Sequence, residues 1–290
     1  MPDDPTAPLR FAHLASLHCG AIRYRPDLLK SAIADVNACE PDAVLVAGDL
    51  TSAGYEWEYE EALAHLDELE APTLSVPGNH DSKNVGYIHF ERMVGPRYHT
   101  WRLPLDPDRA EAVGADGVTV VALDSSQPDL DDGHVGREWY PWLREQVRAH
   151  PDDLSIVMLH HHLVAIPGAG RDLNHIVDAG DVLPILDELA VDVVMTGHKH
   201  VPYFWGLNGI LLCNAGTVST TELRGTVPSS WNELEIDRET VRVYLRYDGG
   251  KRQLAAVRSR SSKASVRASL RVTDDFVESN HLPDLSRSTH

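Results

Sequence analysis

Cysteine is scarce in this sequence, and long apolar runs are absent. The 290 residues include only Cys19, Cys39 and Cys213. Because these three are scattered and odd in number, a disulfide framework is excluded as the basis of the fold. No apolar run approaches the roughly 20 residues of a membrane-spanning helix. The N-terminus is acidic and proline-rich, which argues against a secretory signal. We therefore expect a cytoplasmic protein with reduced thiols and no membrane association.

Positive charge is also in short supply. Lysine and arginine together number 26 against 44 aspartates and glutamates, for a formal net charge of −18. An acidic surface repels phosphate backbones, so we expect no general binding to duplex nucleic acid. A hydrophobic fraction of 42% allows an ordinary core, and the length suits one large domain with a small appendage. The oligomeric state is left open.

Short, continuously apolar runs recur along the first two thirds of the chain. Such runs are typical of strands that are covered on both faces, and they occupy residues 10–15, 43–47, 73–76, 118–123, 154–159 and 191–196. Patterns with one apolar helical face lie between several of them, at residues 27–39, 55–69 and 182–189. Strands that alternate with helices predict a layered α/β domain.

The pattern changes after residue 201. Four further strands, at residues 203–207, 210–214, 232–236 and 240–247, follow without helices between them, which predicts a second, more antiparallel sheet. Asn208-Gly209 is typical of a tight hairpin turn. We place the main domain at residues 1–247 and a basic C-terminal hairpin or tail at residues 248–290. A loosely packed tail is the expectation for 251–290, with a basic arm docked on an acidic neighbour as the alternative.

Histidine is abundant, with 16 residues, and several histidines follow the apolar runs. Ligands of α/β sheets bind beyond the carboxyl ends of the strands. Each fragment taken alone is a weak signal, since a lone histidine is more often an ordinary core or surface residue. Five fragments in order, each after an apolar run, favour a metal site, namely His13–His18, Gly48-Asp49, Gly78-Asn79-His80-Asp81, His160-His161-His162 and Gly197-His198-Lys199-His200.

This ordered set resembles the calcineurin-like metallophosphoesterases, whose pattern is Asp-x-His, Gly-Asp, Gly-Asn-His-Asp/Glu, His and Gly-His-x-His. The resemblance spans roughly residues 9–247. It includes Asn214-Ala-Gly-Thr217, which is similar to a segment in members related to class III cyclic-nucleotide phosphodiesterases. The resemblance implies a four-layer α/β/β/α sandwich, in which two mixed sheets flanked by helices hold the metals at the sheet edge.

The resemblance also implies two divalent metals, of the Mn, Fe, Zn or Ni type, that share the carboxylate of Asp49. One site is implied to contain Asp49, Asn79, His161 and His198. His160 is the second choice for the histidine of that site, and His162 is either a residue facing the substrate or a loop residue. The other site is implied to contain Asp49, His18 and His200.

Two further roles follow from the same resemblance. His80 is implied to act at the leaving-group oxygen without binding metal. Asp81 is implied to orient the His80 ring, and a helix N-cap is the alternative role for it.

The segment from His162 to Gly180 is either a solvated loop or a rim in which Arg171 holds a phosphate. The acidic stretch Asp129–His134 is an exposed loop, with a place near the mouth of the site as the alternative.

Position 16 departs from the family pattern. An aspartate is expected there, and the sequence has Ser16. A neutral hydroxyl brings no charge to a metal, so one tight site and one weakened site are expected. The resemblance implies hydrolysis of phosphodiesters by a metal-held hydroxide, on small nucleotide or glycerol-type substrates. The alternative, which Ser16 supports, is a non-catalytic member that acts as a binding or regulatory protein.

Overall fold

The computed structural model describes residues 7–169, 175–224, 226–260 and 266–267. Two sheets lie face to face in it. The first has the strand order β13-β12-β11-β10-β1-β2-β3 and the second has the order β4-β5-β6-β7-β9-β8. The first sheet consists of β1 (Leu9–Leu14), β2 (Ala43–Val46), β3 (Thr73–Ser75), β10 (Ser230–Ile236), β11 (Thr240–Tyr247), β12 (Arg252–Ser259) and β13 (Val266–Arg267). The second consists of β4 (His99–Pro104), β5 (Gly117–Ala122), β6 (Leu154–Met158), β7 (Val193–Thr196), β8 (Tyr203–Leu207) and β9 (Ile210–Asn214).

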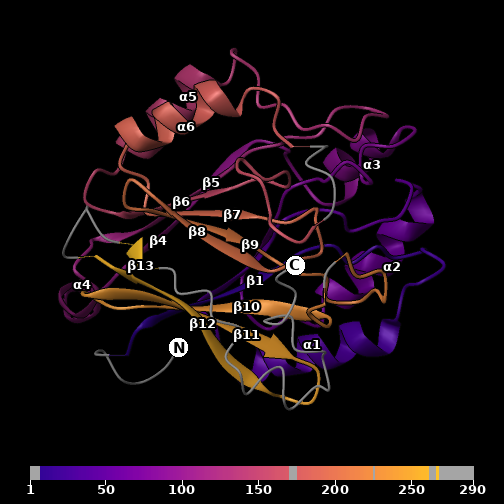
Figure 1. Ribbon diagram of the computed structural model, residues 1–290, viewed down its shortest axis with the longest axis horizontal. Coiled ribbons are helices and arrows are strands. Elements are labelled where there is room, and N and C mark those ends of the chain that lie inside the picture. The colour runs from indigo at the N-terminus through magenta and orange to yellow at the C-terminus, as the bar shows by residue number, and fades with distance from the viewer. Residues whose placement is uncertain (1–6, 170–174, 225, 261–265, 268–290) are drawn as a thin grey trace, which may run out of the picture.

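Helices cover the outer face of each sheet, as Figure 1 shows. The described helices are α1 (Pro26–Ala38), α2 (Glu56–Leu66), α3 (Gly86–Met93), α4 (Pro107–Val113), α5 (Tyr140–Arg148) and α6 (Ala179–Glu188). Helices α1, α2 and α3 pack on the first sheet, and α5 and α6 pack on the second. The four-layer sandwich of two mixed sheets is therefore confirmed. None of the described helices has the length and apolar character that crossing a membrane requires.

The alternation of side chains along β1 shows why the layers form. Phe11 faces the second sheet, where it joins the core between the sheets. Leu14 faces the opposite way and packs with Leu29 and Val36 of α1. Both faces of the strand are thus apolar, as the continuous hydrophobic run predicted.

The division of the late strands between the sheets differs from the expectation. The C-terminal part was expected to form a second, more antiparallel sheet of its own. Instead β8 and β9 extend the second sheet through a parallel pairing of β9 with β7, whereas β10 pairs antiparallel with β1. The hairpin turn at Asn208-Gly209 is confirmed, since the two residues have φ of 48° and 88°. Hairpins are local, and the choice of sheet depends on contacts that are distant in sequence.

The expectation of loose packing beyond residue 251 is wrong for residues 252–259. These residues form β12, which pairs antiparallel with β11. Arg258 is buried, and its guanidinium donates to the Asp192 carbonyl oxygen at 2.9 Å and contacts the Asp192 carboxylate at 3.1 Å. The basic residues of this strand therefore satisfy acidic partners within the domain. Residues 261–265 and 268–290 lie outside the described residues.

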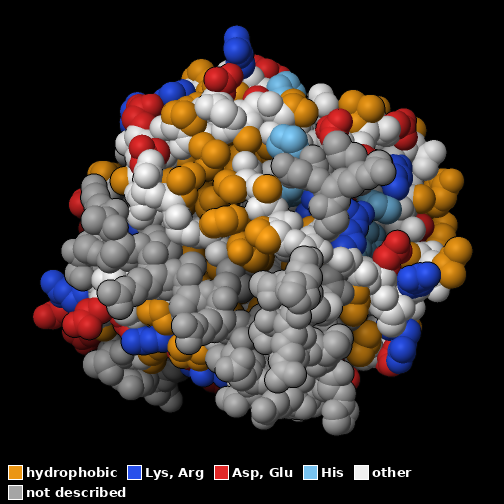
Figure 2. Space-filling model, in the orientation of Figure 1, with side chains coloured by type: hydrophobic (Ala, Val, Ile, Leu, Met, Phe, Trp, Pro, Cys, Tyr) orange, Lys and Arg blue, Asp and Glu red, His pale blue; other side chains and the backbone are white. Residues whose placement is uncertain are grey.

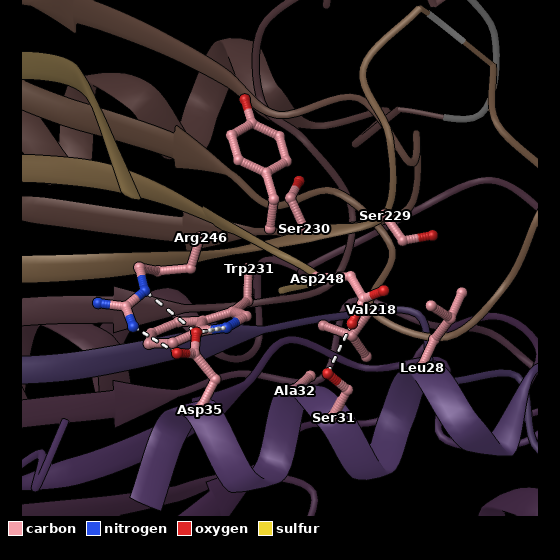
Figure 3. Close-up of a pocket in the computed structure, with 11 residues that line it drawn as sticks. Leu28, Ser31, Ala32, Asp35, Val218, Ser229, Ser230, Trp231, Arg246 and Asp248 are labelled. Carbon is pink, nitrogen blue, oxygen red and sulfur yellow. Dashed lines mark hydrogen bonds and ion pairs between the residues drawn. The ribbon is translucent and has the colours of Figure 1, made fainter. Parts of the chain in front are cut away.

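A partly buried ion pair fixes α1 to the first sheet (Figure 3). Asp35 of α1 accepts hydrogen bonds from Arg246 of β11 at 3.1 Å and from the indole nitrogen of Trp231 of β10 at 3.2 Å. The Arg246 guanidinium also lies over the Trp231 ring, 5.4 Å from its centroid. Since β10 is the direct neighbour of β1, this cluster anchors the strand that leads into the first histidine fragment.

Candidate metal centre

The strand-end fragments meet at the edge of the two sheets where β1, β2, β3, β6 and β7 end. On the side where α2 and α3 lie in Figure 1, histidine and basic side chains come to the surface together in Figure 2. The backbone at this edge is unusual, because several residues other than glycine have positive φ. These are Ser16 (57°), His18 (52°), Asp49 (56°), His198 (71°) and His200 (55°). A positive φ costs conformational free energy in residues other than glycine, and residues with this strained backbone cluster at functional sites.

One half of the centre consists of His18, His200 and Asp49. The Nε2 atoms of the two histidines lie 2.8 Å apart, and His18 Nε2 lies 3.7 Å from Asp49 Oδ2. The other ring nitrogen of His200, Nδ1, contacts the Glu222 carbonyl oxygen at 2.7 Å. That carbonyl oxygen accepts a hydrogen bond from Nδ1–H, which leaves the lone pair of the ring on Nε2. Histidines that bind metal usually donate their other ring N–H to a carbonyl or carboxylate in this way.

The other half consists of Asp49, Asn79, His160 and His198. His160 Nε2 lies 3.2 Å from Asp49 Oδ2 and 3.2 Å from Asn79 Oδ1. His198 Nδ1 lies 3.0 Å from the same Asn79 oxygen. His160 Nδ1 contacts the Ala47 carbonyl oxygen at 2.7 Å, so Nε2 is the nitrogen that faces Asp49 and Asn79. Asp49 Oδ2 therefore lies between the two halves.

His160, rather than His161, has its ring nitrogen among these atoms. Both nitrogens of His161 face elsewhere: Nδ1 contacts Ser125 Oγ at 2.9 Å, and Nε2 contacts the Asp131 carbonyl oxygen at 3.2 Å. These contacts favour the second choice made from sequence, and the ligand role of His161 stays a prediction, because its ligand atom also lies within 4.8 Å of those of His160 and His198. Three adjacent histidines give no sequence signal for which ring turns inward, because the direction depends on how the strand end twists.

His162 is buried at 1% exposure. Neither of its ring nitrogens has a hydrogen-bond partner among the described residues. It lines a small cavity with Tyr203, Trp205 and other residues. His162 therefore belongs to the interior and not to the exposed mouth of the site.

Burial keeps most of these imidazoles neutral. Loss of solvent lowers the pKa of His18, His198 and His200 below the usual histidine value. His160 differs: burial lowers its pKa, but the adjacent Asp49 carboxylate outweighs this and leaves the pKa raised. Burial by itself raises the pKa of Asp49. The neighbouring histidines, His160 first, outweigh burial and hold the pKa of Asp49 well below its usual value, so its carboxylate remains an anion. A neutral imidazole beside a carboxylate is a good donor set for a divalent metal.

Ser16 lies two residues before His18 in the first fragment. The residue is fully buried, and its hydroxyl has no hydrogen-bond partner among the described residues. Its backbone is held on both sides: its nitrogen donates to the Gly48 carbonyl at 3.0 Å and its carbonyl accepts from Thr217 Oγ1 at 2.7 Å. A buried hydroxyl without a partner is unusual. It marks a place where the chain supplies a polar group but no charge.

The Asn214–Thr217 segment holds the first and last fragments in place. Asn214 Nδ2 donates to the Val201 carbonyl at 2.8 Å, just after the Gly-His-x-His fragment. Thr217 Oγ1 bonds to the carbonyl of Ser16, as described above. The segment is thus a structural link between two parts of the metal centre, and it supplies none of the converging donor atoms.

His80 lies beside the centre without joining it. Its ring packs edge-on to His18, with the centroids 4.7 Å apart at 81°. Its Nδ1 contacts the Ser52 carbonyl oxygen at 2.6 Å, and Lys83 Nζ lies 3.4 Å from its Nε2. Its backbone nitrogen donates to Asp49 Oδ1 at 3.0 Å. The ring is partly exposed, so it lies where a bound molecule can reach it.

Asp81 does not orient the His80 ring, and the prediction of that role is wrong. Its carboxylate is fully buried and accepts from the backbone nitrogens of Leu50, Thr51 and Gly78, at 2.9–3.1 Å, and from Thr51 Oγ1 at 2.7 Å. It is not a helix cap either, since α3 begins at Gly86. Burial raises its pKa to about 6. Asp81 thus links the loop that carries Asn79 to the loop that carries Asp49. The orientation of the His80 ring is fixed instead by the carbonyl of Ser52.

Glycine is required at position 78 because the two loops approach so closely. A Cβ atom at Gly78 would lie 2.2 Å from Asp49 Oδ1, well inside van der Waals contact. In the Gly-Asn-His-Asp fragment, the glycine is therefore required by the close approach of the two loops and the final aspartate by its hydrogen bonds to their backbone. The asparagine and the histidine between them face the metal centre.

Sequence reasoning missed Lys83, Ser125 and the role of Asp131. The alternative for the acidic stretch, a place near the site, matches the geometry: Asp131 Oδ1 accepts a hydrogen bond from Asn79 Nδ2 at 3.1 Å. Arg171, proposed as a phosphate contact, lies outside the described residues. No sequence signal identified Lys83, because a lone lysine after a ligand fragment is usually solvated.

The donor atoms fit divalent transition metals. Inward lone pairs come from imidazoles, and oxygen comes from one shared carboxylate and one amide, a set suited to Mn, Fe, Zn or Ni rather than Ca. The two groups of potential ligands found among the described residues are His160, His161 and His198, and His18, Asp49 and His200. The clustering of buried ring nitrogens around one carboxylate suits a divalent cation bound among them.

Comparison with known proteins gives a consistent result. The family model described as calcineurin-like phosphoesterase matches residues 9–202. A protein of Synechococcus sp. named probable cyclic nucleotide phosphodiesterase is 27% identical over 201 residues, covering 68% of this chain and 72% of its own length. A glycerophosphodiester phosphodiesterase of Enterobacter lignolyticus is 28% identical over 162 residues, covering 55% of this chain and 56% of its own.

Solved structures share the fold. A dimetal phosphatase from Danio rerio superposes with a TM-score of 0.62 at 14% identity, covering 84% of this chain and 98% of its own. The inner-membrane-complex anchor GAP50 of Plasmodium superposes with a TM-score of 0.65 at 12% identity, covering 87% and 88%. One of these two is named as an enzyme and the other as an anchor, so the fold alone does not decide the activity.

Proposed function

The chain belongs to the calcineurin-like phosphoesterase family, and from this premise we propose that it is a metal-dependent phosphodiesterase. The observation that carries the proposal is the convergence of four imidazoles and one amide on the shared carboxylate of Asp49. We assign His160, Asn79, His198 and Asp49 to one metal, and His18, His200 and Asp49 to the other. Such metals, when bound, acidify water and stabilise charge on a phosphoryl group.

We propose that the two metals are held unequally. The His160 half offers four protein ligands, whereas the His18 half offers two histidines and a carboxylate that it shares. Ser16 adds an uncharged hydroxyl where the family pattern has an aspartate. Divalent cations are held by the charge and number of their ligands, so the His18 half has the lower affinity.

We assign to His80 the role of proton donor to the leaving group. The contact of its Nδ1 with the Ser52 carbonyl fixes the tautomer and directs Nε2 outward. When the ring carries a proton on both nitrogens, Nε2 donates its proton to the departing oxygen of the substrate, and Nδ1 keeps the proton that it shares with the Ser52 carbonyl. The Lys83 ammonium beside it adds positive charge where the phosphate develops negative charge.

Small phosphodiesters are the proposed substrates. The relatives named as cyclic-nucleotide and glycerol-type phosphodiesterases support this class, and the formal charge of −18 opposes binding of long polyanions. Reduced thiols support the proposed cytoplasmic location, since all three cysteines are free. We propose that the catalytic domain expected at residues 1–247 also includes β12, because β12 pairs with β11 in the first sheet.

A non-catalytic binding protein is the second candidate, and Ser16 is the observation that favours it. The presence of His80 at the mouth favours the enzyme, because a protein that only binds phosphoesters has no need of a proton donor. The two candidates differ in turnover and not in metal content.

The deciding experiment combines elemental analysis with hydrolysis of bis(p-nitrophenyl) phosphate and p-nitrophenyl phosphate in the presence of Mn²⁺. We expect hydrolysis of the diester in preference to the monoester, abolished by Asp49→Asn. A metal-loaded wild-type protein that hydrolyses neither compound, nor any of a panel of cyclic nucleotides and glycerophosphodiesters, would contradict the enzyme and favour the binding protein.

A further inference from the structure

The orientation of the Asn79 side chain has a cause outside the proposed ligand set. Its Oδ1 faces His160 and His198, and its Nδ2 donates to Asp131 Oδ1 at 3.1 Å. Only the oxygen of an amide binds a metal, and the two ends of the group have nearly the same shape. A carboxylate can only accept, so Asp131 holds the nitrogen on its own side and leaves the oxygen for the metal.

The backbone of Asp131 is held by the middle histidine of the triplet. His161 Nε2 contacts the Asp131 carbonyl oxygen at 3.2 Å, and the opposite nitrogen contacts Ser125 Oγ at 2.9 Å. Ser125 Oγ in turn accepts from the His161 backbone nitrogen at 3.1 Å. With Ser125 donating to Nδ1, the proton of His161 is on Nε2, as the contact with Asp131 requires.

The loop that carries Asp131 packs tightly on the same ring. A Cβ atom at Gly133 would lie 2.5 Å from His161 Cγ, and the Gly133 nitrogen donates to the His175 carbonyl at 3.0 Å. Although the Asp131 side chain is exposed, its position is thus fixed by a buried histidine and by the close approach of a glycine.

We propose that Asp131 is a positioning residue for the metal ligand Asn79. Its carboxylate fixes the amide so that Oδ1 faces the metal, and its negative charge increases the electron density on that oxygen. His161 acts through the same path by holding the Asp131 backbone. Outer partners of this kind set ligand orientation and metal affinity. The inference rests on the metal site of the proposed function and concerns only its His160 half.

The test is a titration of metal-free protein with Co²⁺, followed by visible absorption and calorimetry. The variants are Asp131→Ala, which removes the acceptor, and Asp131→Asn, which keeps an acceptor oxygen without the charge. Asp132→Ala is the matched control, because it removes the same charge from an exposed neighbour in the same loop. Thermal unfolding of each metal-free variant checks that the fold is retained.

We expect Asp131→Ala to weaken one Co²⁺ site by about 10–100-fold, the usual cost of losing such a partner, and to shift the absorption band of that site alone. Asp131→Asn should recover part of the loss, and Asp132→Ala should bind as the wild type does. Wild-type affinity in Asp131→Ala would overturn the inference. An equal loss in Asp132→Ala, or equal weakening of both sites, would overturn it too, since loop charge or loop structure would then be the cause.

This readout is independent of hydrolysis. A protein that turns over no substrate but loses Co²⁺ affinity in Asp131→Ala would support the inference and contradict the proposed enzyme. A wild-type protein that binds no Co²⁺ at all would overturn both.

Discussion

The two halves of the metal centre share one carboxylate but differ in how completely their ligands are provided. In the His160 half, each of the three unshared donors contacts another donor at 3.0–3.2 Å, and a carboxylate outside the set holds the amide. In the His18 half, the two histidines contact each other, and the buried hydroxyl of Ser16, two residues before His18, has no hydrogen-bond partner in the part of the chain that the structure describes. The His160 half therefore has its donors in contact with one another and an outer carboxylate that holds one of them. The His18 half lacks the aspartate of the family pattern, and no other carboxylate takes its place among the described residues. The comparison teaches that one position of the family pattern can lack its charge while the backbone that holds both halves is preserved.

Removal of the shared carboxylate should abolish the difference between the halves by weakening both. Asp49→Asn keeps the shape and removes the charge, and loss of a direct ligand exceeds the roughly 10–100-fold cost of losing a group outside the ligand set. We expect the lowest metal content and the lowest activity of all the variants. Elemental analysis after dialysis measures the first. Retention of one metal at the wild-type level would show that the halves do not share Asp49.

Replacement of His80 should leave the comparison intact and stop turnover. His80→Ala removes the proposed proton donor but no metal ligand, so we expect a fall in kcat of about 10²–10⁴-fold with unchanged metal content. Steady-state kinetics and elemental analysis on the same sample measure both. Equal losses of metal and of activity would identify His80 as a ligand.

Exchange of the adjacent histidines separates a ligand from a supporting residue. His160→Ala should cost the His160 half more than the roughly 10–100-fold typical of a supporting group, whereas His161→Ala should stay within that range. The matched pair differs by one position in the chain, and calorimetric titration with Mn²⁺ gives both affinities. A larger loss in His161→Ala would restore the ligand choice made from sequence.

These side chains also show what the sequence could and could not predict. The sandwich and the positions of His18, Asp49, Asn79, His198 and His200 were predictable, because apolar runs and the fragments that follow them are local signals. The direction of the His160 and His161 rings was not predictable, since it depends on a strand-end twist. The contact of Asp131 with Asn79 was equally hidden, because 52 residues separate the two.

The fold had its own unpredictable parts for the same reason. Strand β4 was missed because Arg102, paired with Asp153 at 2.7 Å, interrupts its apolar pattern. Residues 252–259 were expected to lie in a loosely packed hairpin or tail because basic residues without acidic neighbours suggested solvent, yet Arg252 contacts Glu233 and Arg258 contacts Asp192. A charged residue in a sequence indicates a solvent-exposed side chain only when no residue of opposite charge packs against it in the fold.

Restoration of the missing anion should have the smallest effect and should bring the two halves closer together. Ser16→Asp adds a carboxylate next to His18 and His200, so we expect the affinity of the weaker site to rise by at least about 10-fold. Hydrolysis at limiting Mn²⁺ should rise with it. Ser16→Asn, which is nearly the same shape but uncharged, is the control. An equal gain from asparagine would assign the effect to size or to an added oxygen ligand and not to charge.

The central claim is that the wild-type protein has one strong and one weak metal site, and titration of the metal-free protein with Mn²⁺ tests it most directly. The account predicts two binding events, with dissociation constants that differ by at least about 10-fold, and a single metal retained after dialysis against a weak chelator. Two metals retained with indistinguishable affinity would contradict it, because Ser16 or another group would then be completing the His18 half.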